Sequence, residues 1–315
     1  MLPAAVIDLH CDTLVPMEPG RRSDTLNDPN AHLSLSCLPK GVRWGQCFAI
    51  FLPDTLSREE AVAYYARHRD SFFRQMEKFC QWALPCRTAA DIEAAWAQKK
   101  AAALLTVENG SVLAGDLDRV ELLARDGVRM LTLTWNGANE LGSGHSTDRG
   151  LTPFGREAVH ALEEAGILLD VSHLNDRGLE ELLSVARKPF VASHSNARAV
   201  CPHRRNLTDE QIRALVRRCC LIGLNYSVHF LREGGAGASR EDLYQHILHF
   251  LELGAADCLA LGSDFDGTDV PDDLDSPGKV VCLWDFLLQK GLPAELCEKI
   301  MWKNALAFFR ENWTE

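Results

Sequence analysis

The sequence contains no long hydrophobic run. None of its segments reaches the roughly 20 consecutive apolar residues that a membrane-spanning helix requires, so we expect no membrane partner. The first apolar run ends at Asp8 and no basic segment precedes it, which argues against a secretory signal. Paired cysteines are also lacking, because the 11 cysteines are odd in number and form no CxxC motif. Scattered cysteines of this kind favour reduced thiols and a cytoplasmic location, and their spacing excludes a zinc ribbon.

Positive charge is in deficit. The chain has 33 Lys and Arg residues against 44 Asp and Glu residues, which gives a formal net charge of −11. Nucleic-acid binding depends on clustered basic side chains, so we expect no nucleic-acid partner. Hydrophobic residues make up 46% of the chain and charged residues 24%. This is the composition of an ordinary globular protein, and it excludes the disordered, collagen-like and coiled-coil classes.

Short apolar runs alternate with helix-period segments along the whole chain. Runs that are apolar throughout are expected of parallel strands buried on both faces, and eight of them separated by helices predict an α/β fold, the (β/α)8 or TIM barrel. No segment has the composition of an interdomain linker, so we expect residues 1–315 to form one barrel domain. The predicted strands are Val6–Leu9, Gly45–Leu52, Ala102–Val107, Arg129–Thr134, Ile167–Val171, Phe190–Ser193, Leu221–Asn225 and Cys258–Gly262. The predicted helices are Arg58–Trp82, Asp91–Gln98, Leu117–Asp126, Pro153–Ala165, Asp176–Ala186, Asp209–Arg218 and Arg240–Leu253.

A histidine or a carboxylate follows the apolar run of several predicted strands. His10 and Asp12 follow the first strand, Glu108 the third, His173 the fifth and His194 the sixth. Active sites of such barrels lie at the C-terminal ends of the strands, so we expect these five side chains to converge. A single histidine at a strand end is more often only hydrogen-bonded, but five groups on four strand ends favour a metal site. Three imidazoles with two carboxylates suit zinc or a similar ion, not calcium or magnesium.

Other polar residues are open to more than one interpretation. Asp8 precedes the first candidate ligand by two residues, and either orients a ligand or is a buried carboxylate satisfied by the backbone. His145 and His203 fall in loops expected on the active face and are minor candidates for substrate contact. His246 and His249 lie three residues apart in a helical segment, which we interpret as a solvated helix face.

Five motifs together resemble one known family. They are, in chain order, VIDLHCDTL, LLTVENG, LLDVSHLND, FVASHSNARAVCPHRRNLTD and LGSDFDG, and they are similar to the motifs of the membrane (renal-type) dipeptidase family, peptidase family M19. The resemblance extends from about residue 5 to the C-terminus and, without an anchor segment, implies a soluble member. It implies a barrel of the metallo-dependent-hydrolase type that holds two zinc ions. His10 and Asp12 would bind one ion, His173 and His194 the other, and Glu108 would bridge them.

The resemblance also implies catalytic residues and a substrate. Asp264 matches the family's acid/base aspartate, and Arg205 matches the arginine that binds the substrate beside the scissile bond. A hydroxide bridging the ions would cleave dipeptides, including those with a C-terminal D-residue, and members often form homodimers. One departure is Trp135, because the renal-type enzymes have LTHN where this chain reads LTWN, ending in Asn136. An indole N–H donates one hydrogen bond but cannot replace an imidazole, so we expect Trp135 and Asn136 to contact substrate with a changed rate or substrate range.

Two alternatives remain. Another binuclear metal amidohydrolase would act on a small amide or a cyclic amide. Such enzymes typically open with H-x-H and bridge their metals through a carboxylated lysine, whereas this chain has H-x-D and a glutamate. The second alternative is a catalytically impaired homologue that only binds peptides, as Trp135 suggests. Retention of Asp264 and Arg205 counts against it.

Overall fold

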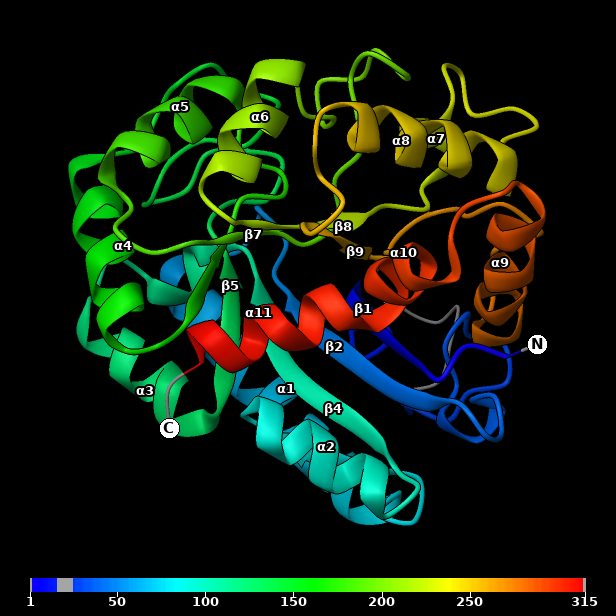
Figure 1. The fold of residues 1–315 in the computed structure, drawn as a ribbon. Helices are drawn as coiled ribbons and strands as arrows, with labels where there is room; N and C mark the ends of the chain where they lie inside the picture. Colours follow the sequence, from blue (N-terminus) through cyan, green and yellow to red (C-terminus); the bar gives the residue numbers. More distant parts are fainter. Residues whose placement is uncertain (1, 16–24, 314–315) are drawn as a thin grey trace.

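Eight parallel strands close into a barrel at the centre of the molecule (Figure 1). The computed structural model describes residues 2–15 and 25–313. The strands pair around the ring in the order β1, β2, β4, β5, β6, β7, β8 and β9, and β9 pairs with β1 to close it. The predicted barrel is confirmed. Its strands are β1 (Ala5–Cys11), β2 (Arg43–Phe51), β4 (Ala101–Glu108), β5 (Val128–Thr132), β6 (Leu168–Asp170), β7 (Val191–Ala192), β8 (Leu221–Leu224) and β9 (Leu259–Leu261).

The barrel strands are buried on both faces, because side chains fill the interior and helices cover the outside. Every residue of β1 and of β4 is buried. The pairing of β2 with β4 runs in register from Gly45 and Ala102 to Phe51 and Glu108. Burial on both faces explains why the strands are continuous apolar runs in the sequence rather than alternating ones.

The helices surround the barrel (Figure 1). Capping boxes begin four of them, with Ser57, Thr88, Thr208 and Ser239 as the N-cap residues. In each box the cap side chain accepts a hydrogen bond from a backbone N–H in the first turn, which satisfies a donor that the helix itself cannot pair. The helices are α1 (Arg58–Lys78), α2 (Ala89–Ala97), α3 (Asp118–Asp126), α4 (Pro153–Glu164), α5 (Asp176–Val185), α6 (Asp209–Arg217), α7 (Val228–Leu231), α8 (Arg240–Glu252), α9 (Pro277–Gln289), α10 (Ala294–Glu298) and α11 (Asn304–Asn312).

The connection between β2 and β4 differs from its prediction. The helix expected over Arg58–Trp82 ends at Lys78, and a further strand, β3 (Ala83–Cys86), follows it. This strand pairs with the first half of β4 and lies outside the eight-membered ring. Pro85 supplies no N–H for a second partner, which suits a strand that pairs on one side only.

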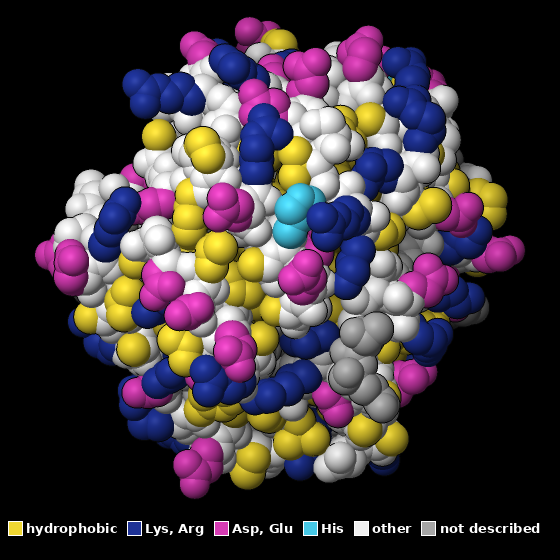
Figure 2. Space-filling view, turned by 90° about the vertical axis from the view of Figure 1, so that its left-hand side faces the viewer, with side chains coloured by type: hydrophobic (Ala, Val, Ile, Leu, Met, Phe, Trp, Pro, Cys, Tyr) yellow, Lys and Arg dark blue, Asp and Glu magenta, His cyan; other side chains and the backbone are white. Residues whose placement is uncertain are grey.

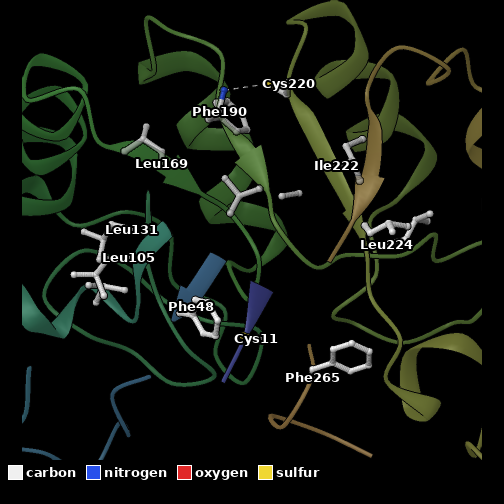
Figure 3. Close-up of a cluster of buried hydrophobic side chains, with 14 of the residues drawn as sticks. Cys11, Phe48, Leu105, Leu131, Leu169, Phe190, Cys220, Ile222, Leu224 and Phe265 are labelled. Atoms are coloured by element: carbon white, nitrogen blue, oxygen red, sulfur yellow. Dashed lines mark hydrogen bonds between the residues drawn. The ribbon is translucent and has the colours of Figure 1, made fainter. Parts of the chain in front are cut away.

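Two buried clusters form the core. In the first, apolar side chains of the strands pack against the helices, and Figure 3 shows part of it, including Phe190 and Cys220, where the Phe190 N–H donates to the Cys220 sulfur at 3.4 Å. The second gathers side chains from the first residues of the strands and from α11, which lies across the strands in red in Figure 1. It includes Ala5, Leu104, Met130, Leu168, Val191, Leu221, Phe308 and Phe309. The N-terminal end of the barrel is therefore apolar and covered, whereas its C-terminal end carries the polar residues.

The outer surface is charged and mixed. On the face in Figure 2, Lys and Arg side chains are interspersed with Asp and Glu side chains, and no broad area of one sign forms. Among the described residues, no helix combines the length and the apolar character needed to cross a bilayer.

Candidate metal centre and active site

The structure brings the five predicted metal ligands together at the C-terminal end of the barrel. His10 and Asp12 come from the end of β1, and Glu108 is the last residue of β4. His173 and His194 follow β6 and β7 within a few residues. All five are buried, and the most accessible, His173, is 9% exposed. Polar side chains buried at this density require partners, and here they are one another's neighbours.

Glu108 lies between two groups of side chains. Its Oε1 atom is 2.8 Å from His173 Nε2 and 3.7 Å from His194 Nε2. Its Oε2 atom is 3.7 Å from His10 Nε2, on the other side. One oxygen of the carboxylate therefore faces His173 and His194, and the other faces His10.

The second group also includes Asp264. His10 Nε2 lies 3.4 Å from Asp12 Oδ2 and 3.9 Å from Asp264 Oδ1, and the three residues form a cluster able to hold a metal ion. His10, Glu108 and His194 form another such cluster. The sequence predicted Asp264 as the acid/base and as a substrate-binding residue at a strand end, but not how close it lies to the ligands, because that distance cannot be read from its position after β9.

Unpaired atoms and distances in this site fit divalent cations. His10 Nε2 and Asp12 Oδ1 are fully buried and lack a hydrogen-bond partner among the described residues. His173 Nε2 and His194 Nε2 are 3.0 Å apart. A tetrahedral ion with ligand bonds of about 2.0–2.1 Å separates its ligands by about 3.3 Å. The spacings between Glu108 Oε1 and these two nitrogens, 2.8 and 3.7 Å, lie on either side of that value.

Burial and neighbouring charges shift the pKa values of the site residues. Burial lowers the pKa of His173 and His194, and nearby cationic groups, Arg205 and His10 among them, lower it further, so both imidazoles are neutral and free to bind a cation. Burial opposes protonation of His10 as well, but Asp12 and Glu108 outweigh it and raise the pKa of His10 to about 10. Burial and the negative charge of Asp12 raise the pKa of Glu108. This surplus of buried negative charge favours cations.

Strained backbone places several of these side chains. His173 has a φ of 71° and Asp264 a φ of 62°, in the left-handed region that residues with a side chain seldom adopt. Asn109, directly after Glu108, has a φ of 90°. These left-handed residues follow three different strands and turn the chain sharply there. Strained backbone of this kind is typically found at functional sites.

Three side chains hold site residues in place. Asn136 Oδ1 accepts a hydrogen bond from His173 Nδ1 at 2.9 Å, so the amide oxygen of this predicted substrate contact is already engaged. Asn225 Nδ2 donates to Asp264 Oδ2 at 3.0 Å. Ser193 Oγ lies 2.7 Å from His194 Nδ1. Sequence reasoning missed the roles of Asn225 and Ser193, although Ser193 stands beside a candidate ligand in the sequence.

A cavity of about 300 Å³ opens onto the centre. Trp135 and Asn136 line it, as do His145 and His203, which the sequence suggested only as minor candidates. Arg205 is 4% exposed and donates to the backbone oxygen of His194 at 3.3 Å. Its Nε atom has no partner among the described residues.

Contacts show how Asp8 and His246 are used in the fold. Asp8 Oδ1 accepts hydrogen bonds from the backbone N–H groups of His10 and Ser263, so it ties together the strand ends that carry the site. His246 is fully buried, and the solvated helix face expected for it is wrong. Its Nδ1 atom accepts from the Ala197 N–H, and its Nε2 atom lies 3.0 Å from the Leu231 oxygen.

A closed (β/α)8 barrel with histidines and carboxylates gathered at its strand ends defines a metal-dependent hydrolase. The sequence model of the family described as membrane dipeptidase (peptidase family M19) matches residues 1–314. The chain belongs to this family and is a metallo-dipeptidase.

Several known proteins are similar to this chain in sequence or structure. A metallopeptidase from Rhodobacter sphaeroides, solved with a phosphinate mimic of the dipeptide L-Ala-D-Ala, has a TM-score of 0.91 and 27% identity, over 99% of this chain and 100% of that chain. Dipeptidase AC, a metallopeptidase of family M19, has a TM-score of 0.90 and 28% identity, over 99% of both chains. An uncharacterized protein of the pqqA 5' region in Klebsiella pneumoniae is 33% identical over 241 residues, 73% of this chain and 89% of that protein.

Proposed function

We propose that the centre holds two divalent ions, that both are zinc, and that Glu108 bridges them. His10 and Asp12 would hold one ion, and His173 and His194 the other. The observation that carries this proposal is the placement of the Glu108 oxygens, one 2.8 Å from His173 Nε2 and the other 3.7 Å from His10 Nε2. The neutral state of His173 and His194 supports it, because a histidine binds metal through an unprotonated nitrogen.

Asp264 is the proposed general acid and base. When bound, the divalent ions lower the pKa of a water molecule and polarise the substrate carbonyl. Asp264 lines the cavity beside His10 and Asp12, where a carboxylate can take a proton and pass it to the leaving amine. The hydrogen bond from Asn225 Nδ2 to its Oδ2 leaves Oδ1 directed toward His10 for this transfer.

Arg205 is the proposed anchor for negative charge on the substrate. Its guanidinium is buried next to His194, and this burial lowers the pKa of Arg205, whereas Asp264 and Glu108 favour its charged form. A buried guanidinium with an unpaired Nε can bind the carboxylate of a dipeptide or the oxyanion that forms at the cleaved carbonyl.

The proposed substrates are dipeptides, including dipeptides with a C-terminal D-residue. The dipeptide mimic bound by the Rhodobacter sphaeroides metallopeptidase supports this choice. The cavity of about 300 Å³ is at the small end of the range for ligand pockets, which favours short substrates. Trp135 lines it and packs edge-on against Phe51, with ring centroids 4.8 Å apart, so the indole is a fixed wall for the substrate side chains.

We also propose a cytoplasmic homodimer. All 11 cysteines are free thiols, which agrees with a reducing compartment. The dimer rests on the family resemblance, and light scattering of the purified protein would test it.

The decisive experiment measures metal content and L-Ala–D-Ala hydrolysis on the same purified sample. We expect two ions per chain, turnover that a chelator abolishes, and recovery when zinc is restored. A cyclic amide tested in parallel should not be cleaved. Two ions without any dipeptide turnover would favour the impaired homologue, and turnover without metal would refute the proposed centre.

A further inference from the structure

We propose that Asp170 and Ser193 act as a hydrogen-bond relay that sets the tautomer of His194 and presents its Nε2 atom to the metal centre. Both are positioning residues, and the role rests on the proposed metal-binding function. The relay runs from Asp170 Oδ2 to Ser193 Oγ at 2.6 Å, and from Ser193 Oγ to His194 Nδ1 at 2.7 Å. All three residues are completely buried, so water does not compete for these contacts.

The relay begins at a carboxylate that accepts four hydrogen bonds. Asp170 Oδ1 accepts from the backbone N–H groups of Ser172 and Ser193, at 3.0 and 2.8 Å. Asp170 Oδ2 accepts from the hydroxyls of Thr132 and Ser193, both at 2.6 Å. Two backbone donors cannot reverse their direction, and the ionised, acceptor-only form is the one that lets both hydroxyls donate as well.

The direction of the remaining hydrogen bonds follows from that charge. The Ser193 hydroxyl donates its single proton to Asp170. In its hydrogen bond with His194 the hydroxyl oxygen must therefore be the acceptor. His194 Nδ1 must then carry the ring proton, and Nε2 keeps its lone pair. That nitrogen is the one that lies 3.0 Å from His173 Nε2 and 3.7 Å from Glu108 Oε1. A carboxylate behind a metal-binding histidine also makes the imidazole a better electron donor.

Neighbouring backbone packs closely against Ser193. Gly223 on β8 and Gly262 after β9 face its backbone. A Cβ atom at either position would lie 1.9 Å from the backbone carbonyl oxygen of Ser193. The segment Ser193–His194 therefore lies against bare backbone on the neighbouring strands. The Ser172 hydroxyl also accepts the backbone N–H of His194 at 3.0 Å. These contacts hold the relay in register with the metal centre.

The test compares zinc affinity in four proteins by competition with a chromophoric chelator: wild type, Ser193→Ala, Asp170→Asn and the double variant. We expect Ser193→Ala to weaken one of the two ions by 10- to 100-fold and to leave the other unchanged. If the two residues form one relay, the zinc affinity of the double variant should be no lower than that of the weaker-binding single variant. Losses that multiply would overturn the relay in favour of two separate structural effects.

Ser195→Ala is the matched control. Its hydroxyl is buried in the same cluster, 3.3 Å from Ser172 Oγ, but forms no hydrogen bond with the His194 ring among the described residues. It should bind both ions like the wild type. Thermal unfolding of the metal-free variants separates loss of affinity from loss of folding, and wild-type affinity in folded Ser193→Ala would overturn the proposal.

Nuclear magnetic resonance of the imidazole nitrogens tests the tautomer directly in metal-free protein. Wild-type His194 should carry its proton on Nδ1. In Asp170→Asn the new amide donates to Ser193, which frees the serine proton for Nδ1 and moves the ring proton to Nε2. A wild-type Nε2–H tautomer would overturn the relay. This measurement needs no bound ion, so it separates failure of the relay from failure of the proposed metal centre.

Discussion

Gly267 lies so close to two site carboxylates that a single methyl group there should disable one side of the centre. A Cβ atom at this position would be 2.0 Å from Asp12 Oδ2 and 2.6 Å from Asp264 Oδ1. Non-bonded carbon and oxygen atoms require at least about 3 Å, so Gly267→Ala must displace the Asp12 carboxylate or the loop by about 1 Å. The loop is also tied to a site residue, because the Gly267 N–H donates to the Asp264 backbone oxygen at 3.1 Å.

The displacement translates into a specific pattern of losses. A misplacement of about 1 Å in an active site costs about 100-fold in rate, and we expect kcat/KM of Gly267→Ala to fall by that factor. The ion held by His10 and Asp12 should dissociate more readily, whereas the ion held by His173 and His194 should stay. Metal content after graded chelation, measured with dipeptide turnover, checks both expectations.

The control is Gly278→Ala, the same substitution in α9, where no described atom beyond the adjacent residues and the helix's own backbone lies within 4 Å of the added Cβ. It should keep full activity and gain slightly in stability, because alanine favours a helix. Near-normal turnover and metal content in Gly267→Ala would refute the placement of Asp12 and Asp264 around this glycine.

Three further predictions concern the proton, the bridge and the pH. Asp264→Asn should fold normally and keep the ion held by His173 and His194, but its kcat should fall by about 10²–10⁴-fold. Near-normal turnover would remove Asp264 from the mechanism. Glu108→Gln should weaken both ions together in metal titrations, whereas loss of only one would contradict a bridge. Burial lowers the pKa of His246 to about 4, below its ordinary value of 6.5. The unfolded chain alone takes up this proton between those values, so His246 by itself should cost the protein about 3 kcal/mol of stability as the pH falls from 6.5 to 4. The difference between wild type and His246→Gln in denaturant titrations at several pH values measures that part of the pH dependence.

The ring of site residues was predictable because a (β/α)8 barrel converts chain order into position. Each strand of such a barrel ends at the same rim, so a polar residue that follows an apolar run must face the centre. This logic placed His10, Glu108, His173 and His194 correctly beside one another. It used only strand ends, and strand ends are marked by the change from apolar to polar residues.

Contacts that depend on which strands pair could not be predicted from the sequence. The link from Asp170 to Ser193 requires β6 and β7 to pair, and neither residue alone differs from a polar residue at an ordinary strand end. His246 was misjudged because helical spacing reports which residues share a face, not what covers that face. Here the Ala197 loop and the end of α7 cover it. The short strand β3 was missed because its four residues include Pro85, which argues against a strand.

The charge of the site links its stability to its function. Asp12, Glu108 and Asp264 are all buried within one cluster, and the permanently charged guanidinium of Arg205 lies near Glu108 and Asp264. Like charges at these distances oppose folding of the metal-free chain, which is why the pKa of Glu108 and of Asp264 is raised by burial and by Asp12. Apolar replacements would make a more stable barrel but an inert one. The carboxylates carry this cost in stability because the divalent cations proposed for the centre would neutralise them, so the repulsion among the carboxylates would also favour the binding of metal.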